Sequence, residues 1–135
     1  MKNLVLLAFA LLGFVSLAHA DGCFYLVEAH VMNKKITYLS ELIDLPYPPG
    51  SKRCSYDSSG NYLRREAKLE EQFVGFIKSL NPGLDVSNID VHAKWYSNEK
   101  EPKFIQHMGN SLVSSGQPDA RGNRVVLLSG NFYSK

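Results

Sequence analysis

Two short acid-x-His patterns are the part of this sequence with the most potential for chemistry. Glu28 and His30 lie two residues apart in one apolar stretch, and Asp90 and His92 repeat the spacing in another. Residues i and i+2 of a β-strand point to the same face, so each pair places a carboxylate beside an imidazole. If the two strands are neighbours, the four side chains converge. Such a group suits a divalent metal, general acid–base catalysis or a pH-sensitive binding surface.

An ordinary role as polar positions on a solvent-facing strand is the interpretation that we favour for these pairs. Spacings of this kind arise often by chance in a single sequence. His30 also shares its predicted face with apolar residues, among them Phe24 and Leu26. We expect His107, on a later helix, to be a surface or boundary residue rather than a third ligand. The sequence therefore predicts no metal site and no cofactor.

A loop rich in proline is the second place where a site could lie. It runs from Leu45 to Asn61 and cannot form a helix interior or a central strand. Its two tyrosines and two neighbouring basic residues have the composition of a contact surface. They are explained equally well as side chains that cover the core. These four candidate binding residues are Tyr47, Lys52, Arg53 and Tyr56.

The first twenty residues have the features of an export signal. Lys2 supplies a positive charge, an apolar run extends from Leu4 to Val15, and small residues at Ala18 and Ala20 form a cleavage site. A membrane anchor is the alternative, but the run is shorter than the ~20 residues that a spanning helix needs. We expect cleavage after Ala20, a single domain over 21–135, no later transmembrane segment, and a periplasmic or secreted protein.

Both cysteines, Cys23 and Cys54, follow the predicted signal. In an oxidising compartment they are expected to form one disulfide, which removes both thiols from nucleophilic or metal chemistry. Acylation of Cys23 is the alternative. The preceding Ala20-Asp21-Gly22 is a poor lead-in for acylation, so the disulfide is our prediction.

The most strongly amphipathic stretch is a predicted helix from Tyr62 to Leu80. Its apolar residues fall on one face at 100° per residue, and it ends at Asn81-Pro82-Gly83. A second helix is expected to begin between Ser97 and Pro102 and to present Phe104, Met108 and Leu112. The predicted strands are 24–32, 36–39 with an extension towards 43, 88–96 and 125–128, with a further stretch through 132–133.

The resulting order is β-β-α-β-α-β, which predicts an α+β fold. We expect a four-stranded mixed sheet with both helices packed on one face. This arrangement makes the longer helix a scaffold and leaves the other face of the sheet, or the loop before that helix, for a site.

Function is less constrained than fold. The sequence has no phosphate-binding glycine loop, no nucleophile elbow and no zinc motif. Its net charge of +2 gives no electrostatic footprint for nucleic acid. We therefore predict a non-enzymatic binding module of inhibitor or immunity type whose partner is another protein of the envelope or extracellular space. The alternatives are a small metal-dependent or acid–base enzyme that uses the two acid-x-His pairs and, third, an exported toxin or effector.

Overall fold

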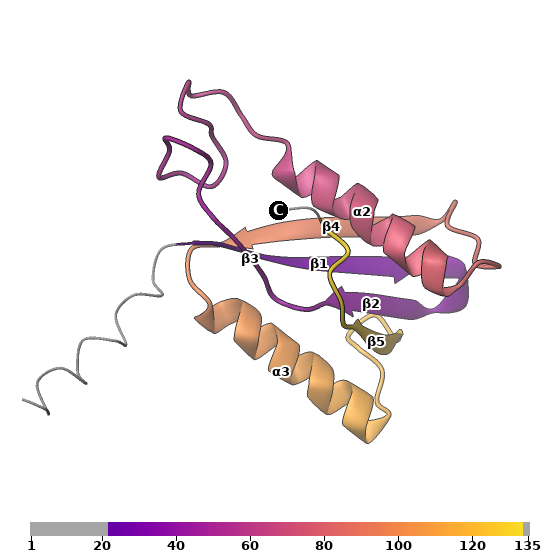
Figure 1. Ribbon diagram of the computed structural model, residues 1–135. Coiled ribbons are helices and arrows are strands. Elements are labelled where there is room, and N and C mark those ends of the chain that lie inside the picture. The colour runs from indigo at the N-terminus through magenta and orange to yellow at the C-terminus, as the bar shows by residue number, and fades with distance from the viewer. Residues whose placement is uncertain (1–21, 134–135) are drawn as a thin grey trace, which may run out of the picture.

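The computed structural model describes residues 22–133, so the predicted signal peptide and its cleavage site lie outside the described residues. Figure 1 shows a sheet with one helix on each side. Within residues 22–133, no helix is both long enough and apolar enough to cross a membrane. The elements in chain order are β1 (Cys23–Val31), the short 3-10 helix η2 (Met32–Lys34), β2 (Ile36–Ser40), β3 (Ile43–Leu45), α2 (Arg65–Leu80), β4 (Ile89–Tyr96), α3 (Lys100–Ser115) and β5 (Arg124–Leu128).

Strand β1 is the centre of the sheet. β4 pairs with it in antiparallel fashion from Phe24 to Val31. On the other edge β2 pairs with its second half and β3 with its first three residues, both antiparallel. β5 completes the sheet by pairing in parallel with β2. The α+β class and the mixed sheet are confirmed. The sheet has five strands rather than four because β3 begins at Ile43, where the returning strand resumes after a short break.

The two helices pack on opposite faces of the sheet, so the prediction that they share one face is wrong. On one face, α2 contributes Leu69, Phe73 and Ile77 to a core that contains every second residue of β1 from Cys23. On the other face, Phe24 and Leu26 pack with Ile105 of α3. Only Glu28 of the nine residues of β1 is exposed. A strand with apolar residues on both sides needs a cover on each face, and a single layer of helices cannot supply it.

Helix α3 turns a different side to the sheet from the one predicted. Phe104 is 62% exposed and Met108 is also exposed, whereas Gly109 is buried. A Cβ atom at Gly109 would lie 3.0 Å from Cδ2 of Leu39 and 3.3 Å from Cδ2 of Leu127. The missing side chain lets the helix approach the sheet closely. The spacing of large apolar residues could not predict this contact, because glycine has no apolar side chain to count.

Helix α2 begins at Arg65, three residues later than predicted. Tyr62 lies before the helix, where it is exposed and forms an isolated β-bridge with Tyr56. From Leu69 to Ile77 the predicted apolar face is the one turned to the core, whereas Leu80 at the end of the helix is exposed. The C-terminal segment forms no strand in its described part. Its Phe132 ring instead packs against Phe73 of α2, with 4.9 Å between the ring centroids.

Candidate functional site

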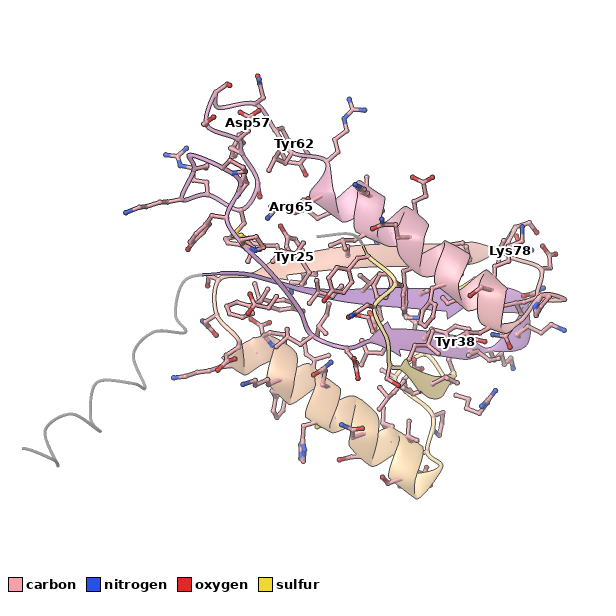
Figure 2. All side chains as sticks on the ribbon, in the orientation of Figure 1. Tyr25, Tyr38, Asp57, Tyr62, Arg65 and Lys78 are labelled. Carbon is pink, nitrogen blue, oxygen red and sulfur yellow. A yellow bond between two sulfur atoms is a disulfide. The ribbon has the colours of Figure 1, made fainter. Side chains whose placement is uncertain are left out.

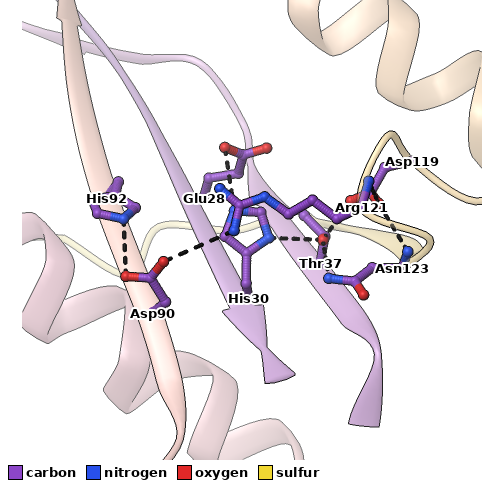
Figure 3. A network of polar contacts seen from close by, with 8 residues as sticks. All are labelled: Glu28, His30, Thr37, Asp90, His92, Asp119, Arg121 and Asn123. Atoms are coloured by element: carbon purple, nitrogen blue, oxygen red, sulfur yellow. Dashed lines mark hydrogen bonds and ion pairs between the residues drawn. The ribbon is translucent and has the colours of Figure 1, made fainter. Parts of the chain in front are cut away.

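The two acid-x-His pairs face each other across β1 and β4. The register places Glu28 opposite His92 and His30 opposite Asp90. All four belong to the face of the sheet that α3 partly covers, because they alternate with the residues that pack against α2. The structure therefore brings together the four residues that the spacing singled out (Figure 3).

Within this group each carboxylate lies beside the imidazole of its own strand. Nε2 of His92 lies 2.9 Å from Oδ1 of Asp90, and Nη1 of Arg121 lies 4.0 Å from Oδ2 of the same carboxylate. The side chains of Asp90 and Arg121 are each about half exposed. Exposed pairs of this kind contribute little to stability, typically about 0–1 kcal/mol. The described residues include no group of three or more His, Cys, Asp or Glu side chains that could hold a metal.

His30 differs from the other three because it is buried, with 2% of its surface exposed. Its Nδ1 lies 2.9 Å from Oγ1 of Thr37, and this hydroxyl donates to Oδ2 of Asp119 at 2.6 Å. The Thr37 oxygen also accepts a hydrogen bond from the side-chain amide of Asn123 at 3.2 Å. A threonine hydroxyl has only one hydrogen to donate. Because Asp119 takes it, Nδ1 of His30 must be the donor to Thr37.

The carboxylate of Asp119 anchors this network to the loop before β5. Its Oδ1 accepts hydrogen bonds from the backbone N–H groups of Arg121 and Asn123 at 2.9 and 2.8 Å. Partial burial raises the pKa of Asp119, but the hydrogen bonds from Thr37, Asn123 and Arg121, with nearby His30, outweigh burial and leave the pKa below its ordinary value. The acceptor role that the network assigns to Asp119 is therefore its favoured state.

The remaining nitrogen of His30 is not available to a substrate. Nε2 is buried and makes no hydrogen bond among the described residues. The carboxylate Oε2 of Glu28 lies 3.6 Å from it. A general acid or base must come within hydrogen-bond reach of the proton it transfers. In this arrangement His30 connects β1, β2 and the loop 117–123, and only Glu28, Asp90 and His92 face solvent. His107 lies apart from this network, exposed on α3.

The four loop residues predicted as a contact surface also come together. Tyr47, Lys52, Arg53 and Tyr56 line a depression of about 300 Å³ beside the disulfide, and Trp95 completes it from the end of β4. We call it the loop depression. Trp95 alternates with Ile89, Val91 and Ala93, which pack against the core, but its side chain is 41% exposed because it lies at the end of the sheet. Only its position next to the last residue of the strand hinted at this exposure.

The wall of the loop depression is held by covalent and hydrogen-bonded contacts. The Cys23–Cys54 disulfide ties the loop to the start of β1, which confirms the predicted pairing. The carboxylate of Asp57 accepts hydrogen bonds from the backbone N–H groups of Ser59 and Asn61, both at 2.9 Å. These contacts fix the turn that leads from the loop into α2, and Figure 2 shows it above the start of that helix.

A buried tyrosine supports the loop from below. The hydroxyl of Tyr25 points at the carbonyl oxygen of Cys54, 3.5 Å away. Burial raises the pKa of Tyr25, although a hydrogen bond with Arg65 acts in the opposite direction. The phenol therefore keeps the proton that it directs at the loop. Through this residue the loop depression rests on both β1 and the first turn of α2.

The acid-x-His group and the loop depression are separate sites. Trp95 and His92 lie three residues apart on β4, about 10 Å along a strand, and their side chains point to opposite faces.

Comparison with models of known protein families, with curated proteins and with solved structures gives no match for this chain. Its function is therefore argued from these two sites.

Proposed function

We propose that this chain is a small exported module that binds another protein of the envelope or extracellular space through the loop depression. The disulfide is typical of an oxidising compartment. The proposal includes export to the periplasm or the medium, with cleavage after Ala20 leaving a single domain over 21–135. An inhibitor or immunity-type protein is the form of binding module that we favour.

The loop depression is the single observation that carries this proposal. Its lining includes the exposed rings of Tyr56 and Trp95 together with Arg53, and tyrosine, tryptophan and arginine are residue types enriched in protein interfaces. The disulfide holds the loop that forms this depression. Binding of a partner therefore costs less conformational entropy, because the loop does not have to be ordered first. These features support binding and require no catalytic group.

Acid–base catalysis at the acid-x-His group is a second candidate function. The register that sets Glu28 opposite His92 and His30 opposite Asp90 favours it. The burial of His30 Nε2 opposes it, because a substrate cannot reach that atom while Glu28 holds its present position. His92 is the imidazole open to solvent. If the protein has an enzymatic activity and the His92→Ala variant retains it, acid–base catalysis by the acid-x-His group does not explain that activity.

Capture from envelope and secreted fractions tests the proposed function. The immobilised disulfide-bonded protein is compared with its Trp95→Ala variant and with Phe104→Ala, which removes another exposed aromatic ring from the far side of α3. We expect a reproducible partner that Trp95→Ala loses and Phe104→Ala retains. Equal capture by all three proteins would show that the loop depression is not the binding surface. Absence of any reproducible partner at low salt would count against a binding module.

A further inference from the structure

We propose that the loop depression takes an aromatic side chain from an acidic segment of the partner protein, with the flanking carboxylates on Lys52 and Arg53. This inference rests on the proposed function and specifies the chemistry of its partner. It follows from three properties of the described residues: the size of the depression, its aromatic lining and its unneutralised positive charge.

The size of the loop depression favours one side chain over a whole small molecule. Its volume of about 300 Å³ is at the bottom of the ~300–1,000 Å³ range of small-molecule sites. A drug-sized ligand would leave much of its surface in water. A single large side chain of a protein can fill such a space while the rest of the partner lies on the rim.

The aromatic lining specifies what kind of side chain fits. Trp95 and Tyr56 are 41% and 40% exposed, and Tyr47 is partly exposed beside them. Aromatic side chains bury a large apolar area, and pairs of rings also attract one another in edge-to-face or offset-stacked arrangements beyond the effect of the area that they bury. An aromatic side chain of the partner therefore gains more here than an aliphatic one of similar volume.

The positive charge specifies what flanks that side chain. Lys52 and Arg53 are exposed, and neither side chain has an ion pair or hydrogen bond with any described residue. Of the described residues that line the depression, none is Asp or Glu. Asp44 lies beside Gly22 but does not line it. An arginine guanidinium matches a carboxylate with two parallel hydrogen bonds, and lysine adds a second cation.

The loop 46–64 contains one acidic residue, Asp57. Asp57 directs Oδ1 at the backbone N–H groups of Ser59 and Asn61, so it holds the turn rather than neutralising Arg53. The chain as a whole carries a formal charge of only +2, which disfavours a polyanion such as nucleic acid as the occupant. Two cations beside an aromatic depression suit a short acidic segment that contains an aromatic residue.

Tryptophan fluorescence tests this inference directly, because Trp95 is the single tryptophan of the chain. The disulfide-bonded protein is titrated with blocked five-residue peptides: a phenylalanine between two acidic residues on each side, the same peptide with lysines as flanks, and the acidic peptide with alanine at the centre. We expect the first peptide to change the Trp95 emission and to bind at least about 10-fold more tightly than the other two. Its affinity should fall as salt is added.

Charge reversal separates electrostatic recognition from general stickiness. The double variant Lys52→Glu with Arg53→Glu is expected to bind the acidic peptide at least about 10-fold more weakly and to favour the lysine-flanked peptide. Lys68→Glu with Lys78→Glu changes the net charge by the same amount on the exposed side of α2 and is the matched control. We expect this control to bind the acidic peptide like the wild type.

Each opposing outcome overturns a defined claim. Equal affinity for the acidic and lysine-flanked peptides, or no response of Trp95 to any peptide, would overturn the acidic aromatic segment. Binding of an acidic oligosaccharide in place of the peptides would do the same and would change the partner class. If the peptides fail while capture from the envelope fraction still depends on Trp95, the proposed function stands without this partner chemistry. If capture is also independent of Trp95, both proposals fall.

Discussion

Thr37 donates its only hydroxyl hydrogen to Asp119, and this one bond fixes the tautomer of His30. The hydrogen on Nδ1 of His30 is therefore directed at Thr37, and Nε2 lies 3.6 Å from Oε2 of Glu28. Residues distant in the sequence, on β1, β2 and the loop 117–123, are thereby joined in one buried network. The feature of the sequence that looked most like catalysis is, in its buried part, a structural contact between these segments.

Removal of the Thr37 hydroxyl should destabilise the protein. In Thr37→Val, the Nδ1–H of His30 and the amide of Asn123 lose their common acceptor, and Asp119 loses a donor. Buried polar groups left without partners cost about 1–3 kcal/mol, so we expect the free energy of unfolding to fall by about 2–3 kcal/mol in urea titrations. Thr37→Ser keeps the hydroxyl and is the control. A loss below about 0.5 kcal/mol for Thr37→Val would contradict the network.

Asp119 should make stability depend on pH in the acid range. Its folded pKa lies below the value of about 3.9 expected for an unfolded aspartate. The unfolded chain therefore binds the proton more readily, and the contribution to stability, complete above the unfolded pKa, is lost as pH falls through the folded pKa. We expect unfolding free energies measured between about pH 6 and pH 2 to decline less steeply in Asp119→Asn. The pKa of exposed Asp85 is also lowered, chiefly by hydrogen bonds with Ser87, so Asp85→Asn serves as the comparison.

Two glycines in the two helices should respond in opposite ways. A Cβ atom added at Gly75 of α2 would have no heavy atom within 4 Å, so Gly75→Ala should raise the free energy of unfolding by up to about 1 kcal/mol through helix propensity alone. A Cβ atom added at Gly109 of α3 would meet Leu39 and Leu127 at 3.0 and 3.3 Å. Gly109→Leu should cost about 1–3 kcal/mol by forcing the helix off the sheet. Thermal unfolding of the two variants distinguishes them, and a neutral Gly109→Leu would show that α3 does not pack as described.

Loss of the disulfide should weaken both the fold and the loop depression. Cys23→Ser with Cys54→Ser removes the link between β1 and the loop, across a sequence separation of 31 residues. We expect the free energy of unfolding to fall by about 3 kcal/mol. At a temperature where the variant is still folded, the acidic aromatic peptide should bind more weakly, because the freed loop must be ordered on binding. Unchanged peptide affinity in the folded variant would show that the disulfide does not shape the site.

The sequence alone was sufficient for the features that depend on local patterns. Alternation identified β1 and β4, helical periodicity identified the buried face of α2 between Leu69 and Ile77, and the two cysteines predicted their own pairing. Loop composition selected Tyr47, Lys52, Arg53 and Tyr56, which do lie around one depression. Each of these follows from residue type and spacing within a short window.

Only the tertiary structure decided which segments meet. Periodicity fixes the faces of each element but not the order of strands or the side on which a helix packs, so the opposite placement of α2 and α3 was not predicted. The hydrogen bonds that hold His30 in the interior also join distant residues. Thr37 lies 7 residues from His30 in the sequence, and Asp119 lies 82 residues from Thr37. The exposure of Trp95 depends on where the sheet ends. Long-range packing sets all three, because free energy is gained where surfaces from distant segments exclude water together.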